Sequence, residues 1–184
     1  MWRIGSRIAV VAAIALVVSA ARTSAAIPKD PCTVLTRTQV RHLLLDHRVV
    51  GVRHRRNPKN RAEECTWVTG YVQTARLGRL HAAFSLRLTI EPVASAAVPL
   101  ATLRAGVRNP TNETTVTIPN LGDEAYSLQG DTIVVSGDVV FQVAVDNYDS
   151  AVRPFPQVDR ITRRAGVLVL EQLDRRPSPR PGGS

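Results

Sequence analysis

Four histidines are the residues of this sequence best suited to acid–base chemistry or metal binding, because an imidazole changes its charge near neutral pH. They are His42, His47, His54 and His81. No two of them have the His-x-x-x-His spacing that places two metal ligands on one face of a helix. None has a serine and an acid beside it in the arrangement of a local triad, so only a triad assembled in space is left open.

Asp123 and Glu124 form a pair of adjacent carboxylates. Glycosidase chemistry needs two acids on either side of one bond, whereas neighbours in sequence point in different directions. We therefore interpret these acids as turn and solvent residues. With only two cysteines in the chain, a structural zinc site built on thiolates is also excluded. The sequence predicts no catalytic residue, no metal site, no cofactor and no enzymatic activity.

The strongest charge feature is a one-sided basic stretch between Asp46 and Glu63, in which hydrophobic periodicity is lost and a loop is predicted. One interpretation is a solvated loop that is kept extended by the repulsion between its positive charges. The other is a weak, salt-sensitive contact with an anionic surface such as phospholipid head groups or an acidic wall polymer. Nucleic acid is not expected, because no aromatic side chain interleaves the basic ones. The stretch contains Arg48, His47 and His54, and its candidate contact residues are Arg53, Arg55, Arg56, Lys59 and Arg61.

The two cysteines, Cys32 and Cys65, are predicted to form a disulfide, because paired cysteines are usual in exported chains. The bridge would join the start of the first helix to the first strand of a sheet. Trp67 lies two residues after Cys65, on the same face of that strand. We expect it in the core beside the disulfide, near Val40 and Leu44.

The N-terminal residues have the pattern of an export signal. Arg3 and Arg7 precede an uncharged apolar run from Ile8 to Ala21, and small residues follow at 23–26. This predicts a signal peptide over residues 1–26, cleaved after Ala25 or Ala26; an uncleaved anchor is the alternative. A lipid anchor on Cys32 is not expected, since charge and proline precede it. The protein is therefore expected in the cell envelope or the medium.

Composition places the rest of the chain in one domain. Residues 1–26 contain three arginines and no acid, so the formal charge falls from +9 to +6 when they are removed. About 150 remaining residues can bury a core without metals. We expect a single domain over 27–173 and a disordered tail, rich in proline and arginine, over 174–184.

Helical and strand patterns alternate along this domain. Thr36 and Gln39 have capping-box spacing at the start of a short helix over 37–45. Strict alternation over 84–91 predicts a half-buried antiparallel strand. The further expectations are strands over 65–71, 114–118, 125–128, 132–136 and 139–145, with helices over 96–107 and 156–173. These predict an α+β fold, an antiparallel sheet with helices packed on one face, in an order consistent with two related halves.

Three short signatures in this order resemble the actinobacterial family called domain of unknown function 3558, which occurs in secreted proteins and lipoproteins. They are Asp30-Pro31-Cys32-Thr33-Val34-Leu35-Thr36, Cys65-Thr66-Trp67 and Ile118-Pro119-Asn120-Leu121-Gly122-Asp123-Glu124-Ala125. The resemblance implies an extracytoplasmic α+β domain with a Cys–Cys bridge and no established reaction. The chain departs from the family where Asn120 and Asp46 replace usual glycines and where many members have a lipobox.

Three functions follow as expectations. The first is a non-catalytic binding or sensor module of the envelope that holds a small ligand, a lipid or an envelope protein. The second is a structural or interaction protein without a small ligand. The third is an uncharacterised hydrolase. A contiguous apolar cleft would favour the first, a shallow closed surface the second, and a histidine beside a serine or carboxylate in a cleft the third.

Overall fold

A computed structural model describes residues 27–73, 80–82, 84–105, 115–147 and 157–175. The helical elements are η1 (Pro31–Thr33), α1 (Arg37–Leu43), η2 (Val93–Ser95), α2 (Leu100–Arg104) and α3 (Val158–Asp174), where η is a 3-10 turn. The strands are β1 (Val49–Asn57), β2 (Ala62–Thr69), β3 (Tyr71–Gln73), β4 (Leu80–Ala82), β5 (Phe84–Pro92), β6 (Val116–Thr117), β7 (Glu124–Leu128), β8 (Asp131–Ser136) and β9 (Val139–Asn147).

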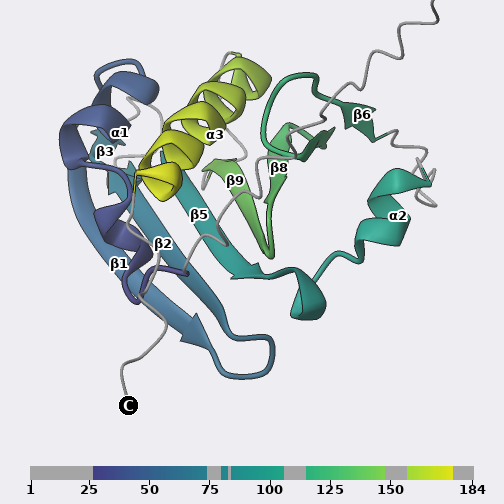
Figure 1. The fold of residues 1–184 in the computed structure, drawn as a ribbon. Coiled ribbons are helices and arrows are strands. Elements are labelled where there is room, and N and C mark those ends of the chain that lie inside the picture. The colour runs from purple at the N-terminus through teal and green to yellow at the C-terminus, as the bar shows by residue number, and fades with distance from the viewer. Residues whose placement is uncertain (1–26, 74–79, 83, 106–114, 148–156, 176–184) are drawn as a thin grey trace, which may run out of the picture.

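Seven of the strands form one antiparallel sheet in the order β1-β2-β5-β9-β8-β7-β6, and β3 and β4 pair separately. Each half of the chain contributes strands that run in sequence from an outer position to the centre, where β5 meets β9. The two halves of the sheet are therefore arranged alike. The helices do not repeat this arrangement, because α1 and α3 lie together in front of the sheet while α2 stands apart from them (Figure 1). The predicted α+β class is confirmed.

The main core lies between the sheet and the layer of α1 and α3. The alternation in β5 places Phe84, Leu86, Leu88 and Ile90 in this core, as the sequence predicted. The predicted capping box also forms, since Thr36 Oγ1 accepts from Gln39 N at 3.2 Å and Gln39 Oε1 accepts from Thr36 N at 2.8 Å. The terminal helix matches its predicted range within two residues and contributes six buried residues, among them Ala165 and Val169.

The disulfide between Cys32 and Cys65 is present, with a Cα–Cα distance of 5.1 Å. It joins η1 to β2, the second strand of the sheet, and not the first strand as expected. Trp67 is 1% exposed and belongs to the same core cluster as Val40 and Leu44. The core interpretation of Trp67 is therefore confirmed.

The stretch predicted to be a basic loop forms β1 and a short turn, so that prediction was wrong. As an edge strand β1 pairs only with β2, and the side chains from Arg53 to Asn57 are all exposed. A strand without a well-buried face carries no apolar alternation, which removes the signal on which strand prediction depends. Charged side chains on an edge strand also protect it from pairing with other chains.

The helix predicted over 96–107 is shorter, because α2 begins only after Pro99, where the chain is still extended. It packs on the opposite face of the sheet, away from α1 and α3. There Leu103 belongs to a second apolar cluster with Tyr126, Ile133, Val135 and Val140. One end of this face is thus covered, while the other end, over β1, β2 and β5, carries polar side chains.

Glu124 holds α2 against the sheet. Its carboxylate accepts from Arg104 Nε at 2.9 Å and from Tyr126 Oη at 2.6 Å. Asp123 Oδ2 accepts from Gly137 N at 2.7 Å. Glu124 therefore makes structural contacts on β7, which corrects its interpretation as a turn and solvent residue, whereas Asp123 is exposed in the turn before β7, as expected.

We expect Glu124 to make stability depend on pH. The Arg104 side chain lowers the pKa of Glu124 from 4.5 to about 2, with Tyr126 as the next contribution. A lowered pKa stabilises the fold above the unfolded pKa, and this stabilisation is lost as the pH falls from about 4.5 to 2. After solvent screening, Glu124→Gln should cost about 1 kcal/mol at pH 7 and nothing at pH 2. Urea unfolding at both values measures this difference; Glu171→Gln, in an exposed helical pair, is the control.

Asp46, Asn120 and Gly122, which lie in two turns, have left-handed backbone conformations. Asp46 and Asn120, which stand where the family usually has glycine, both have positive φ values, of 65° and 59°. Asparagine tolerates this left-handed region better than most residues. At Gly122, with φ of 66°, a Cβ would lie 2.5 Å from the Val135 carbonyl oxygen, so only glycine fits.

Several predicted features lie outside the described residues: the signal peptide 1–26, the last two residues of the helix predicted over 96–107, and nearly all of the tail. Within the described ranges, no helix has the length and apolar character needed to span a membrane.

Candidate functional site

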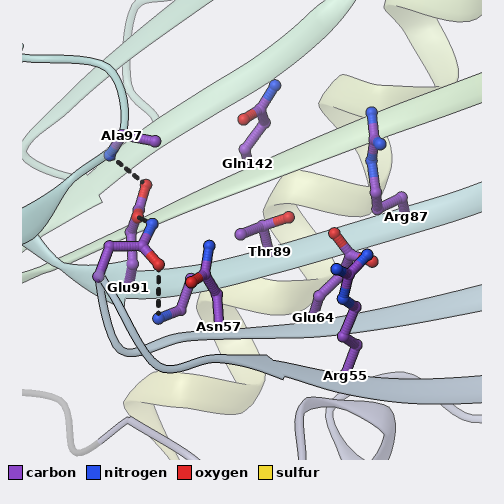
Figure 2. Close-up of a pocket in the computed structure, with 10 residues that line it drawn as sticks. Arg55, Asn57, Glu64, Arg87, Thr89, Glu91, Ala97 and Gln142 are labelled. Atoms are coloured by element: carbon purple, nitrogen blue, oxygen red, sulfur yellow. Dashed lines mark hydrogen bonds between the residues drawn. The ribbon is translucent and has the colours of Figure 1, made fainter.

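A groove of about 360 Å³ lies on the polar part of the open sheet face. Its floor is a row of side chains that the strand register places directly opposite one another across four strands. Arg55 on β1 faces Glu64 on β2, Glu64 faces Thr89 on β5, and Thr89 faces Gln142 on β9. With about 4.8 Å between strands, the row extends roughly 14 Å. Figure 2 shows these side chains from the groove side, with Arg55 beside Glu64.

The polar groups of this row are available to a ligand. Among the described residues, Arg55 and Glu64 make no ion pair, although their charges are opposite and they face each other in register. Thr89 likewise has no side-chain hydrogen bond within the described ranges. Gln142 donates its amide to Asp131 Oδ2 at 2.6 Å, which leaves its carbonyl oxygen for the groove. The floor therefore presents a cation, an anion, a hydroxyl and an acceptor in one line.

Glu91 fixes one wall of the groove. One of its oxygens accepts from Asn60 Nδ2 at 2.7 Å and the other from the Ala97 backbone N–H at 3.0 Å (Figure 2). The residue is only 7% exposed, and burial raises its pKa while the two hydrogen bonds act against that shift. Because both oxygens have donors, Glu91 ties the β1–β2 turn to the chain after η2 and has little capacity left for a ligand.

The opposite end of the groove is bounded by Arg87, whose guanidinium lies 3.3 Å from Asp146. Asp131, behind Gln142, has a pKa raised by burial, with the Gln142 hydrogen bond opposing the shift. This half-buried acid holds the Gln142 amide in one orientation. The strands thus position all four side chains of the floor, and a hydrogen bond to Asp131 also orients Gln142.

The groove suits a small, polar, charged molecule. It is not the contiguous apolar cleft that was expected to favour a binding module, since its lining is dominated by charged and amide side chains. Among its lining residues there is no aromatic ring on which a sugar could stack. No group of three or more potential metal ligands occurs in the described part of the chain.

The structure divides the five predicted contact residues among different surfaces. Arg55 lines the groove. Arg56 and Arg61 line a separate hollow beside the N-terminal leader. Arg53 and Lys59 are exposed and line neither of them. These side chains lie on both faces of β1 and in its turn, because successive side chains of a strand point to opposite faces. The weak contact of these residues with an anionic surface stays a prediction.

Three of the histidines have different surroundings. His42 on α1 lies 3.0 Å from Asp46, His54 on β1 lies 2.8 Å from Glu63, and the His47 ring meets the Phe84 ring edge-on. His81 is on β4, and its side chain lies outside the described part of the structure. Of the residues of the groove floor, the sequence indicated Arg55 but not Glu64, Thr89 or Gln142, because only the strand register brings these four together.

Comparison of the chain with protein-family models, with curated proteins and with solved structures finds no match.

Proposed function

We propose that the protein is an exported, non-catalytic binding module whose groove holds a small zwitterionic ligand of the amino-acid or short-peptide type. The observation that carries this proposal is the pair of opposite charges on the groove floor, Arg55 and Glu64, which make no ion pair within the described part of the chain. A guanidinium binds a carboxylate through two parallel hydrogen bonds, and a carboxylate binds an ammonium group. Arg55 on β1 would therefore bind the ligand's carboxylate, and Glu64 on the neighbouring strand β2 would bind its ammonium group.

The neighbouring polar groups fit the remaining chemistry of such a ligand. The Thr89 hydroxyl and the Gln142 carbonyl oxygen lie next in the row and can bind peptide or side-chain polar groups. A volume of about 360 Å³ is at the small end of ligand sites, which suits a compact molecule. The groove has a mainly polar lining and not the apolar one that would support a lipid ligand. A lipid is therefore not proposed as the ligand of this groove.

The export part of the proposal is supported by the apolar N-terminal segment and by the disulfide, which is typical of oxidising compartments. The proposed family, domain of unknown function 3558, is supported by the three signatures of the sequence and their order. The alternative is an interaction protein of the envelope that uses the same open face without a small ligand. His54 Nε2 lies 2.8 Å from Glu63 Oε2 in a second hollow, which is the kind of contact expected to favour a hydrolase, so that function stays a further alternative.

We expect Arg55→Gln and Glu64→Gln each to weaken ligand binding about 10- to 100-fold, because a hydrogen bond to a charged group contributes about 1.5–3 kcal/mol. Calorimetric titration with a panel of free amino acids and dipeptides measures the affinities. Both substitutions are on the exposed side of strands, so the melting temperature should stay close to that of the parent.

Arg53→Gln is the matched control, since it removes the same charge from the same strand but lies outside the groove. It should bind like the parent protein. Equal losses in Arg53→Gln and Arg55→Gln would indicate a general charge effect and refute the groove as the site. Binding of no member of the panel would favour the interaction protein.

A further inference from the structure

A second hollow, of about 640 Å³, lies beside the β1–β2 turn at the bottom of Figure 1, between that turn and the N-terminal leader. It is lined by the helix-side positions of β1 and β2, so it is distinct from the groove on the opposite face. Its lining residues are Ile27, Pro28, Lys29, His54, Arg56, Arg61, Glu63 and Pro92.

The charges around this hollow are unbalanced. Of the described residues that line it, Glu63 alone is acidic, and its side chain is 10% exposed. That carboxylate is already engaged, by Arg56 Nε at 3.2 Å and by His54 Nε2 at 2.8 Å. Asp30, outside the lining, lies 4.0 Å from His54 Nδ1. Among the described residues, Lys29 and Arg61 have no side-chain partner, so two permanent positive charges remain to be neutralised.

Arg61 also has an unfavourable backbone conformation. It is the last residue of the turn and has a φ of 56°, in the left-handed region that glycine or asparagine adopts more readily. An arginine therefore occupies a position where glycine would be less strained. Five other non-glycine residues, Leu45, Asp46, Asn120, Gln129 and Gln157, share this conformation, so the strain alone does not mark a binding side chain.

We propose that this hollow binds a phosphate group. Arg61 and Lys29 are its main contacts, and Arg56, which is positioned by its ion pair with Glu63, is a further contact. Guanidinium groups match the geometry of phosphate oxygens, and a lysine adds a point charge. The other wall, formed by Ile27, Pro28 and Pro92, is apolar. It can accommodate an apolar substituent, so the phosphate can belong to a phospholipid head group or be free.

Arg61→Gly tests this proposal most sharply, because it removes the guanidinium and relieves the strained backbone. We expect the affinity for phosphate to fall at least about tenfold while the melting temperature stays the same or rises. Lys29→Gln should weaken binding in the same direction. Titration calorimetry with inorganic phosphate and with short-chain dihexanoyl phosphatidylglycerol measures both effects and distinguishes the sources. Equal affinity for the two probes indicates free phosphate, and tighter binding of the lipid indicates a head group.

Lys59→Gln is the control in the same turn, because Lys59 lines neither cavity. It should retain binding, as should Arg55→Gln, which separates this site from the proposed amino-acid groove. Unchanged affinity in Arg61→Gly, or an equal loss in Lys59→Gln, would overturn the proposal. Absence of binding of either probe to the parent protein at physiological salt would also overturn it.

Discussion

Trp67→Ala should destabilise the protein by about 3–5 kcal/mol, a large share of the total stability of a domain of this size. The indole is 1% exposed and packs in the main core cluster with Val40, Leu44 and the half-buried Val52. Truncation leaves a cavity that rigid strands on both sides of β2 cannot close. Unfolding in urea, followed by circular dichroism, measures the loss.

Thr66→Ala is the control for this substitution, since Thr66 is the neighbouring residue on β2 and points to the other face. It should change stability by less than about 0.5 kcal/mol. Trp67 is the only tryptophan outside residues 1–26, so its emission reports one site. A spectrum typical of water-exposed indole, with ready acrylamide quenching, would contradict the buried position.

Replacement of both Cys32 and Cys65 by alanine should cost about 3–4 kcal/mol. The two residues are 33 apart in sequence, and the chain-entropy model gives this value for a loop of that length. The double substitution avoids a free thiol at Cys65, which is fully buried. Denaturant unfolding of the oxidised parent and of the double variant gives the difference.

Reduction of the parent under unfolding conditions should produce the same loss as the double substitution, while the double variant should not respond to reductant. Alkylation of the unreduced, unfolded protein followed by mass spectrometry provides an independent check. Two alkylated cysteines, or a double variant as stable as the parent, would show that the bridge does not hold η1 to β2.

Regular periodicity made much of the fold predictable. The alternation of β5 and the helical spacing of α3 each belong to an element with one buried face, and both match the structure closely. The capping box at Thr36 and Gln39 is a local motif, so it too could be read directly. The edge strand β1 was missed because it has no well-buried face.

The candidate site was not predictable, because it depends on register between distant segments. Arg55 and Glu64 are close in sequence, but their opposition follows from a turn that was not foreseen. Thr89 and Gln142 join them only through the pairing of β2 with β5 and of β5 with β9. No periodic signal marks a residue as the cross-strand neighbour of another.

Native mass spectrometry of the protein purified from the cells that produce it tests the proposed function most directly. The parent and Arg53→Gln should each carry one additional mass in the range of an amino acid or short peptide. Arg55→Gln should carry much less of it. A bare polypeptide in the parent, or the same bound mass in Arg55→Gln, would contradict binding in the groove formed by Arg55, Glu64, Thr89 and Gln142.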